Sequence, residues 1–242
     1  MDTFTVMHLH NAASGRAEDL ASAYAAQAER FLALPGAVGT QRFRVPELQL
    51  HAESAQPWGF ATQYVFKADA PDAVLPALAP LLDELREAGL IADDGTERIY
   101  AYCMYGEWYY SDNLTPGEPL THLMFLLANI TAGADAEYHK WYDEVHRYEV
   151  SEAVGYVGMQ RGKLSEMQVP PVHYCPGSEL ILGALQCDDL EFTIKDFIDR
   201  AYGRSPSGVA WSPRPKSASI ARTVHIAESV QGPFPASFVP QG

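Results

Sequence analysis

The chain has 242 residues, 47% of them hydrophobic, and a formal net charge of −14 at pH 7. This length can bury one large core or two smaller ones. Nucleic acids and anionic membranes are bound by basic surfaces, so the acidic balance excludes both as expected partners and favours an apolar small molecule. The three cysteines have no metal-binding spacing and no transmembrane run is present, which predicts a cytoplasmic protein with reduced thiols.

The first half of the chain has the pattern of a β-α-β-β-α-β unit, the ferredoxin-like arrangement. Pro35 and Gly36 end its first helix, as proline and glycine do after a last helical turn. The expected elements are, in chain order, strand 4–10, helix 17–34, strands 38–48 and 58–67, a helix from 72 to about 89, and strand 96–105.

The second half repeats this order after a segment rich in glycine, proline and asparagine. Its expected elements are strand 120–131, helix 135–152, strands 157–164 and 180–186, helix 190–202, and strand 217–225. The last residues contain several prolines, which exclude a helix. We therefore divide the chain into a repeat over 1–105, a linker over 106–118, a second repeat over 119–227 and an extended C-terminal arm over 228–242.

The two halves also share a sequence motif. Residues 36–42 and 155–161 both have the pattern G-x-V-G-x-Q-R, 119 positions apart (155 − 36). Earlier in each half, Asn11 and Asn129 correspond at a spacing of 118 (129 − 11), one residue out of step. Such a spacing, near half the chain length, indicates a duplicated unit.

A ferredoxin-like sheet has two faces, and its helices cover only one of them. The strand residues Tyr100, Tyr102 and Met104 alternate with Ile99 and Ala101, so neither face has the charges that a solvent-facing surface requires. We expect the two bare faces to press together around a cavity. The predicted fold class is therefore α+β, with tandem ferredoxin-like (βαββαβ) repeats forming an intramolecular pseudo-dimeric α+β barrel. Further pairing into a homodimer is left open.

One helix of the second half carries a family signature. Its residues 137–146, E-Y-H-K-W-Y-D-E-V-H, are followed by G-Y-V-G at 155–158. This resembles the W-Y-D-x-x-H…G-(F/Y) signature of EthD-like members of the dimeric α+β barrel superfamily. The resemblance implies a barrel fold, in a superfamily that includes cofactor-free monooxygenases, isomerases, polyketide cyclases, dehydratases and some haem-binding proteins.

The same helix supplies the main catalytic candidates. In an α-helix, Tyr142 and Asp143 precede His146 by four and three residues, so the three side chains share one edge. A carboxylate beside an imidazole raises its basicity, so we expect Asp143 to orient His146 as a general base. Trp141 and Tyr142 are expected to contact substrate. The alternative is that Asp143 and His146 are only a surface pair.

His8 and His10 are two apart on the first strand and so point to the same face. If Met7 and Leu9 face the helices, both imidazoles face the cavity between the sheets. Their possible roles are acid–base catalysis, metal ligation or structural hydrogen bonding; two histidines alone are too few to predict a metal site. His122 opens the matching strand of the second half and is expected to contact substrate.

Several other residues are expected to contact substrate. Tyr100 and Tyr102 can donate hydrogen bonds inside a cavity while their rings pack against an aromatic ligand. His173 lies in a proline-rich loop that is expected to close one mouth of the barrel. Arg42 and Arg161 occupy the same place in both motifs, which favours a structural role, although Arg161 can also present its planar fork to an anionic substrate.

These features predict a cofactor-independent lyase, isomerase or cyclase that transfers protons on an aromatic or polyketide-like compound. Phosphate-binding loops, dinucleotide fingerprints and nucleophile elbows are absent from the sequence. One alternative is a cofactor-free monooxygenase of phenolic substrates, which oxygen uptake would distinguish. The other is a haem or small-ligand binding protein without catalysis, which a Soret band would reveal.

Overall fold

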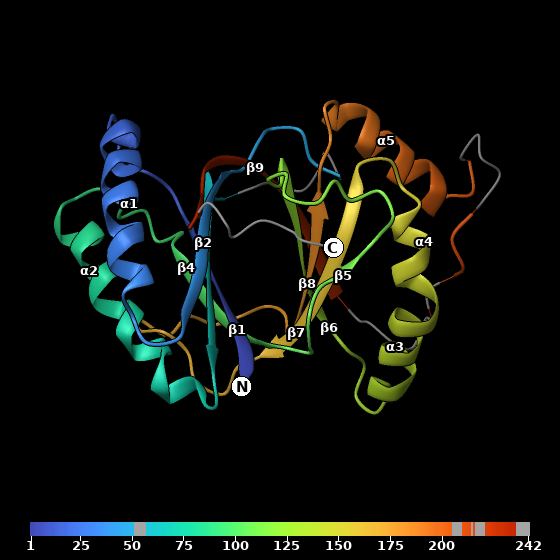
Figure 1. The fold of residues 1–242 in the computed structure, drawn as a ribbon, viewed down its shortest axis with the longest axis horizontal. Coiled ribbons are helices and arrows are strands. Elements are labelled where there is room, and N and C mark those ends of the chain that lie inside the picture. Colours follow the sequence, from blue (N-terminus) through green and yellow to red (C-terminus); the bar gives the residue numbers. More distant parts are fainter. Residues whose placement is uncertain (51–56, 205–209, 214, 216–220, 236–242) are drawn as a thin grey trace.

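The computed structural model describes residues 1–50, 57–204, 210–213, 215 and 221–235. It is a mixed α+β fold in which helices flank a large antiparallel sheet on two opposite sides (Figure 1). The first half contains β1 (Asp2–His10), α1 (Ala17–Leu32), β2 (Ala37–Arg44), β3 (Phe60–Ala68), the short turns η1 (Pro71–Ala73) and η2 (Leu75–Leu78), α2 (Ala79–Glu87) and β4 (Arg98–Met104).

The second half follows a two-residue strand, β5 (Tyr109–Tyr110), which lies within the segment expected to be a linker. It contains β6 (His122–Asn129), α3 (Asp135–Trp141), the π-helical turn η3 (Tyr142–His146), α4 (Arg147–Ser151), β7 (Tyr156–Leu164), β8 (Glu179–Leu185), α5 (Leu190–Ala201) and β9 (Ala221–Phe234). The continuous helix expected over 135–152 is therefore interrupted by a π turn.

The strands of the two halves follow the same spatial order. The sheet runs β4-β1-β3-β2 and continues β9-β6-β8-β7, with β5 at its end. An additional pairing between β4 and β7 closes eight of the described strands into a ring, and every pairing in it is antiparallel. The last strand of each half thus pairs with the second strand of the other.

The C-terminal segment belongs to this ring. Residues 228–234 were expected to start a separate arm, but β9 continues to Phe234 and pairs with β2. The two prolines near its end suggested a break in regular structure. Gly232 and Pro233 fall where the register between β2 and β9 shifts, so the strand accommodates them at an irregularity.

Two of the hydrophobic clusters lie between helices and strands, one in each half. Phe4, Val6 and Phe31 belong to the cluster under α1 and α2. Tyr138 and Ile194 belong to the one under α3, α4 and α5. Figure 1 shows these two groups of helices on opposite outer sides of the strands.

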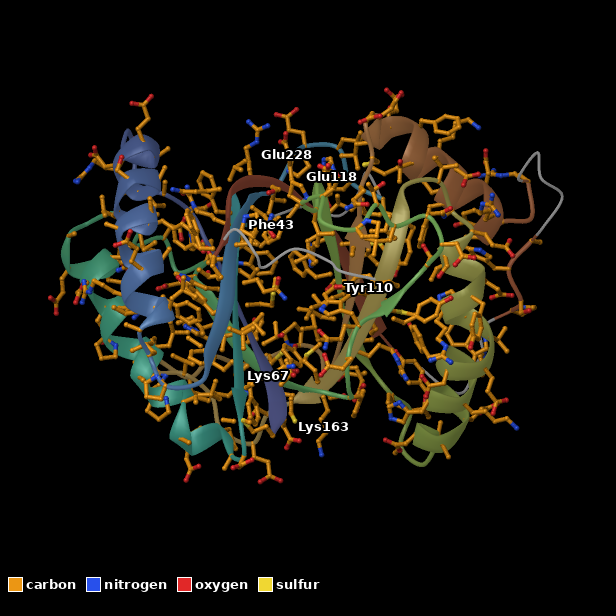
Figure 2. All side chains as sticks on the ribbon, viewed as in Figure 1. Phe43, Lys67, Tyr110, Glu118, Lys163 and Glu228 are labelled. Atoms are coloured by element: carbon orange, nitrogen blue, oxygen red, sulfur yellow. The ribbon has the colours of Figure 1, made fainter. Side chains whose placement is uncertain are left out.

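A third cluster fills the space between the two halves, where side chains from both sets of strands meet (Figure 2). His225 is buried there, with its ring 4.8 Å from Phe125 and 5.3 Å from Trp58. The main members are Met7, Leu9, Phe43, Tyr100, Tyr102, Leu123, Phe125, Leu127, Leu180 and Leu182. The cavity expected between the bare faces is thus occupied by packed side chains, and a cavity of about 400 Å³ lies instead on the helix-facing side of the second half.

None of the described helices is both long and apolar enough to cross a membrane.

Candidate functional site

A cavity of about 400 Å³ opens in the second half, between its strands and the helices α3, α4 and α5. This size lies within the range of small-molecule sites, and most of the lining is aliphatic or aromatic. The lining residues are Leu50, Met124, Leu126, Trp141, Tyr142, His146, Val150, Tyr156, Met159, Ile181, Phe197, Ile198, Ala201, Tyr202, Trp211, Ser212, Pro213 and Val224.

His146 is held among aromatic rings at the wall of this cavity. Its imidazole stacks on Trp141, with ring centroids 4.1 Å apart and an interplanar angle of 16°. The rings of Tyr142 and Trp211 meet it edge-on at 5.1 and 5.6 Å. These contacts fix the plane of the imidazole while leaving its side chain 16% exposed.

Glu149 is the carboxylate beside His146. Its Oε2 lies 3.5 Å from Nδ1 of His146. Its Oε1 accepts a hydrogen bond from the backbone N–H of Ser212 at 2.5 Å, and its carbonyl accepts one from Trp211 Nε1 at 2.9 Å. One glutamate therefore lies beside the imidazole and also holds Trp211 and Ser212, which line the cavity.

The expected partner of His146, Asp143, instead binds Arg161. The Nη2 of Arg161 donates to Asp143 at 2.5 Å, and its Nη1 donates to Nδ1 of His139 at 3.1 Å. The prediction that Asp143 orients His146 is wrong because the backbone between them is a π turn. A π turn closes five residues apart, so side chains three apart no longer share an edge.

The π turn also explains the register shift between the repeats. Asn11 and Asn129 are 118 apart and precede the helices, whereas Gly36 and Gly155 are 119 apart and follow them. The first-half helix α1 is regular, and the second-half helix contains η3. A π bulge adds one residue to a helix and is frequent at functional sites. The extra residue lies in the turn that ends at His146.

Polar groups near His146 can hold an oxygen atom of a ligand. Trp141 Nε1 is buried and has no hydrogen-bond partner. Burial raises the pKa of the Tyr156 hydroxyl, which therefore stays protonated and can donate a hydrogen bond. Both residues line the cavity.

His8 and His10 face the first-half helices rather than the space between the halves. Met7 and Leu9 occupy the interior instead, so the expected orientation of β1 is wrong. His8 Nε2 donates to Glu97 at 2.7 Å, and burial lowers the pKa of both histidines. Among the described residues, no group of three potential ligands could hold a metal ion with them.

Five other expected substrate contacts lie away from the 400 Å³ cavity. Tyr100 and Tyr102 are interior, where their hydroxyls donate to the carbonyls of residues 174 and 177. His122 lies beside Thr121 and Cys187. Burial and the charge of Arg98 lower the pKa of His173, which places it near the first half. Arg161 lines a separate hollow of about 100 Å³.

Trp141, Tyr142 and His146 therefore lie together at the wall of this cavity, whereas Glu149 and Trp211 were not predicted. Glu149 lies three residues after His146 on regular helix, so the spacing alone could have predicted that the two side chains are neighbours. Trp211 lies between α5 and β9 in a segment without periodic pattern, so the sequence offers no comparable sign of its position.

No family model matches the sequence, and no curated protein is similar to it in sequence. Solved structures do match over nearly the whole chain. A candidate monooxygenase from Lactobacillus acidophilus has a TM-score of 0.54 at 12% identity, covering 95% of this chain and 94% of that one. One from Fusobacterium nucleatum has a TM-score of 0.53 at 10% identity, covering 95% and 93%. An anthrone oxidase-like protein has a TM-score of 0.49 at 11% identity, covering 98% and 95%.

At these identities the likeness shows a shared sheet-rich α+β fold and nothing finer.

Proposed function

We propose that this chain is a cofactor-independent enzyme that deprotonates a phenolic or polyketide-like aromatic compound and lets the resulting anion react with dioxygen. The observation that carries the proposal is the imidazole of His146, set in the wall of an aromatic cavity of about 400 Å³ with a carboxylate 3.5 Å away. An apolar cavity with few polar groups selects a flat, largely hydrophobic ligand.

The acid–base step follows from this arrangement. With Nδ1–H directed to Glu149, Nε2 of His146 carries the lone pair that accepts the proton. Glu149 stabilises the imidazolium that forms. The N–H of Trp141 and the hydroxyl of Tyr156, both of which line the cavity, would donate hydrogen bonds to the oxygen of the substrate anion, where negative charge develops.

Oxidation then needs only substrate and oxygen. A methylene activated by two neighbouring rings loses a proton, and its electron-rich anion reduces O2. In the net change CH2 plus O2 becomes C=O plus H2O, so the substrate itself supplies the electrons. The two structural neighbours with TM-scores above 0.5 are named as candidate monooxygenases, which favours this outcome over others.

The wider assignment is part of the same proposal. Two tandem ferredoxin-like repeats, closed into a pseudo-dimeric α+β barrel of the EthD-like type, would account for the shared strand order and for Trp141, Tyr142 and His146 of the signature lining one cavity. A cytoplasmic location and a possible homodimer stay predictions.

A matched pair of histidine variants tests the role of His146. In His146→Gln the base is removed, and kcat/KM for oxygen uptake on a fused-ring phenol with an activated methylene should fall about 10²- to 10⁴-fold. His139→Gln changes a histidine on the preceding helix that does not line the cavity, and should leave turnover within about threefold. Full turnover by His146→Gln would contradict the proposal.

A lyase, isomerase or cyclase is the second candidate, because the His146–Glu149 pair can move a proton without oxygen. Product formation under argon, with no oxygen consumed in air, would establish it in place of the oxidative reaction. A Soret band in the purified protein would favour the haem-binding alternative.

A further inference from the structure

Arg42 is a buried cation without a carboxylate partner. Its side chain is on β2 and the residue is 2% exposed. Its Nε and Nη2 are buried and make no hydrogen bond, and no described aspartate or glutamate forms an ion pair with it. Its guanidinium carbon lies 4.0 Å from the ring centroid of Phe60. Burying an unpaired charge is strongly unfavourable, so a compensating anion is expected.

The corresponding arginine of the second half, Arg161, has the side-chain partners that Arg42 lacks. Arg161, 119 positions later (161 − 42), has Asp143 at 2.5 Å and His139 at 3.1 Å. His139 precedes the π turn and Asp143 is the second residue of it. Counting back 118 positions, the spacing found before the turn, gives Ala21 and Ala25 as their first-half equivalents. Both are alanines, which supply neither charge nor bulk.

Other buried groups near Arg42 also have unused hydrogen-bonding capacity. Thr62 lies directly opposite Arg42 on β3 and is 1% exposed, and its hydroxyl has no partner. His10 is 2% exposed, with an unpartnered Nδ1 and its ring 5.8 Å from that of Phe60. Gln231, opposite Arg42 on β9, has an unpartnered Oε1. Such groups normally find partners in a folded protein.

We propose that Arg42 binds a small planar monoanion of the carboxylate class, such as formate, acetate or bicarbonate. The two unpartnered nitrogens, Nε and Nη2, form the edge of the guanidinium that binds two oxygens side by side. The hydroxyl of Thr62 is available to donate a further hydrogen bond. A single negative charge replaces the one that Asp143 supplies in the second half, and the anion stands where that side chain would reach.

Thermal unfolding of the full chain in sodium formate tests the site, with sodium gluconate keeping the ionic strength constant. Gluconate is too bulky to replace one aspartate side chain. The midpoint of the wild-type chain should rise with formate and saturate, by about 5 °C at a hundredfold excess over Kd. Arg42→Met should show no rise. Arg161→Met, which removes the arginine that already has a carboxylate partner, should keep the response.

A second variant copies the second half into the first. Ala25→Asp supplies an internal carboxylate to Arg42, so the midpoint should rise without formate and the formate response should disappear. This variant keeps the guanidinium in place and serves even if Arg42→Met does not fold. The proposal is overturned if formate, acetate and bicarbonate all leave the wild-type midpoint unchanged, if Arg42→Met responds like the wild type, or if Ala25→Asp keeps the full response.

Discussion

The two halves of this protein have the same order of strands, yet their helix-facing spaces differ. In the first half, aromatic side chains such as Tyr64, Phe31 and Phe66 fill the space between helices and strands. In the second half, the same space contains a cavity of about 400 Å³ beside His146. One scaffold can therefore serve as packed core or as ligand site, depending on a few side chains.

Two differences account for much of this divergence. Tyr64 of the first half corresponds to Gly183 of the second (183 − 64 = 119). Tyr64 lies on β3, which pairs with β2, and Gly183 lies on β8, which pairs with β7. Both positions are on the helix-facing side of the sheet. Gly183 has no side chain, and the ring of Tyr156, which lines the cavity, lies over it, so that an added Cβ would come within 2.8 Å of a ring carbon of Tyr156. The second difference is the π turn, which has no counterpart in α1.

Removing the filling ring of the first half should have the largest effect. Tyr64 is 2% exposed and its ring centroid lies 5.0 Å from that of Phe31. Tyr64→Ala should lower the free energy of unfolding by about 3 to 5 kcal/mol, because it leaves a void in a packed core. Urea denaturation measures the loss. Tyr174→Ala, at an 87% exposed site, is the control and should change stability by less than about 0.5 kcal/mol. A loss below about 1 kcal/mol in Tyr64→Ala would show that the space is not tightly filled.

Deleting Glu144 should convert the π turn into regular helix and rotate His146 away from the cavity. Glu144 is exposed, so the fold should persist, with an unchanged circular dichroism spectrum. Turnover should fall about 100-fold, and quenching of Trp141 and Trp211 by 1-naphthol should be lost. Glu144→Ala keeps the chain length and should behave as the wild type. Retained binding and turnover in the deletion variant would separate the π turn from the site.

Replacing the carboxylate beside His146 should have a smaller effect. Glu149→Gln keeps an oxygen for the Ser212 N–H but no longer stabilises an imidazolium. We expect kcat to fall about 10- to 100-fold with little change in KM. Glu152→Gln alters a half-exposed carboxylate that pairs with Arg200 and should leave kcat unchanged. Equal rates for the two variants would exclude Glu149 from the proton transfer.

The smallest effect concerns the pH dependence of stability. Burial raises the pKa of Glu179 to about 7, although Tyr105 donates to it at 2.9 Å and Arg161 opposes the rise. Because the folded-state pKa lies above the unfolded one, the neutral form stabilises the fold fully at pH 4 and this contribution is lost as pH rises through 7. Glu179→Gln should match the wild type at pH 4 and be about 1 to 2 kcal/mol more stable at pH 8. Thermal or urea unfolding at both values checks this, and a difference that does not change with pH would contradict it.

The element order and the motif shared by the two halves could be recognised from residue spacing alone. The motif at 36–42 and its copy at 155–161 align without any knowledge of structure, and the order of strands and helices follows from periodicity. The site helix could also be found, since Trp141, Tyr142 and His146 form an unusual aromatic cluster.

The orientation of β1 could not be predicted, because Phe4 and Val6 are as apolar as Met7 and Leu9. Alternation then gives the period of a strand but not which face meets the helices. The partner of His146 was missed for a different reason. The one-residue shift between the repeats was visible, but only the backbone shows that it is a π turn between Asp143 and His146.

Through the pairing of β9 with β2 and of β4 with β7, each half holds the other by its last strand. Separating the halves would break both strand pairs at once and expose to water the hydrophobic cluster that they share. Neither half is therefore expected to be stable alone. Exchange of one half with a related gene would have to preserve two strand registers at the same time. Such a molecule is expected to diversify by substitutions within its halves, as Gly183 and the π turn illustrate, and rarely by shuffling them.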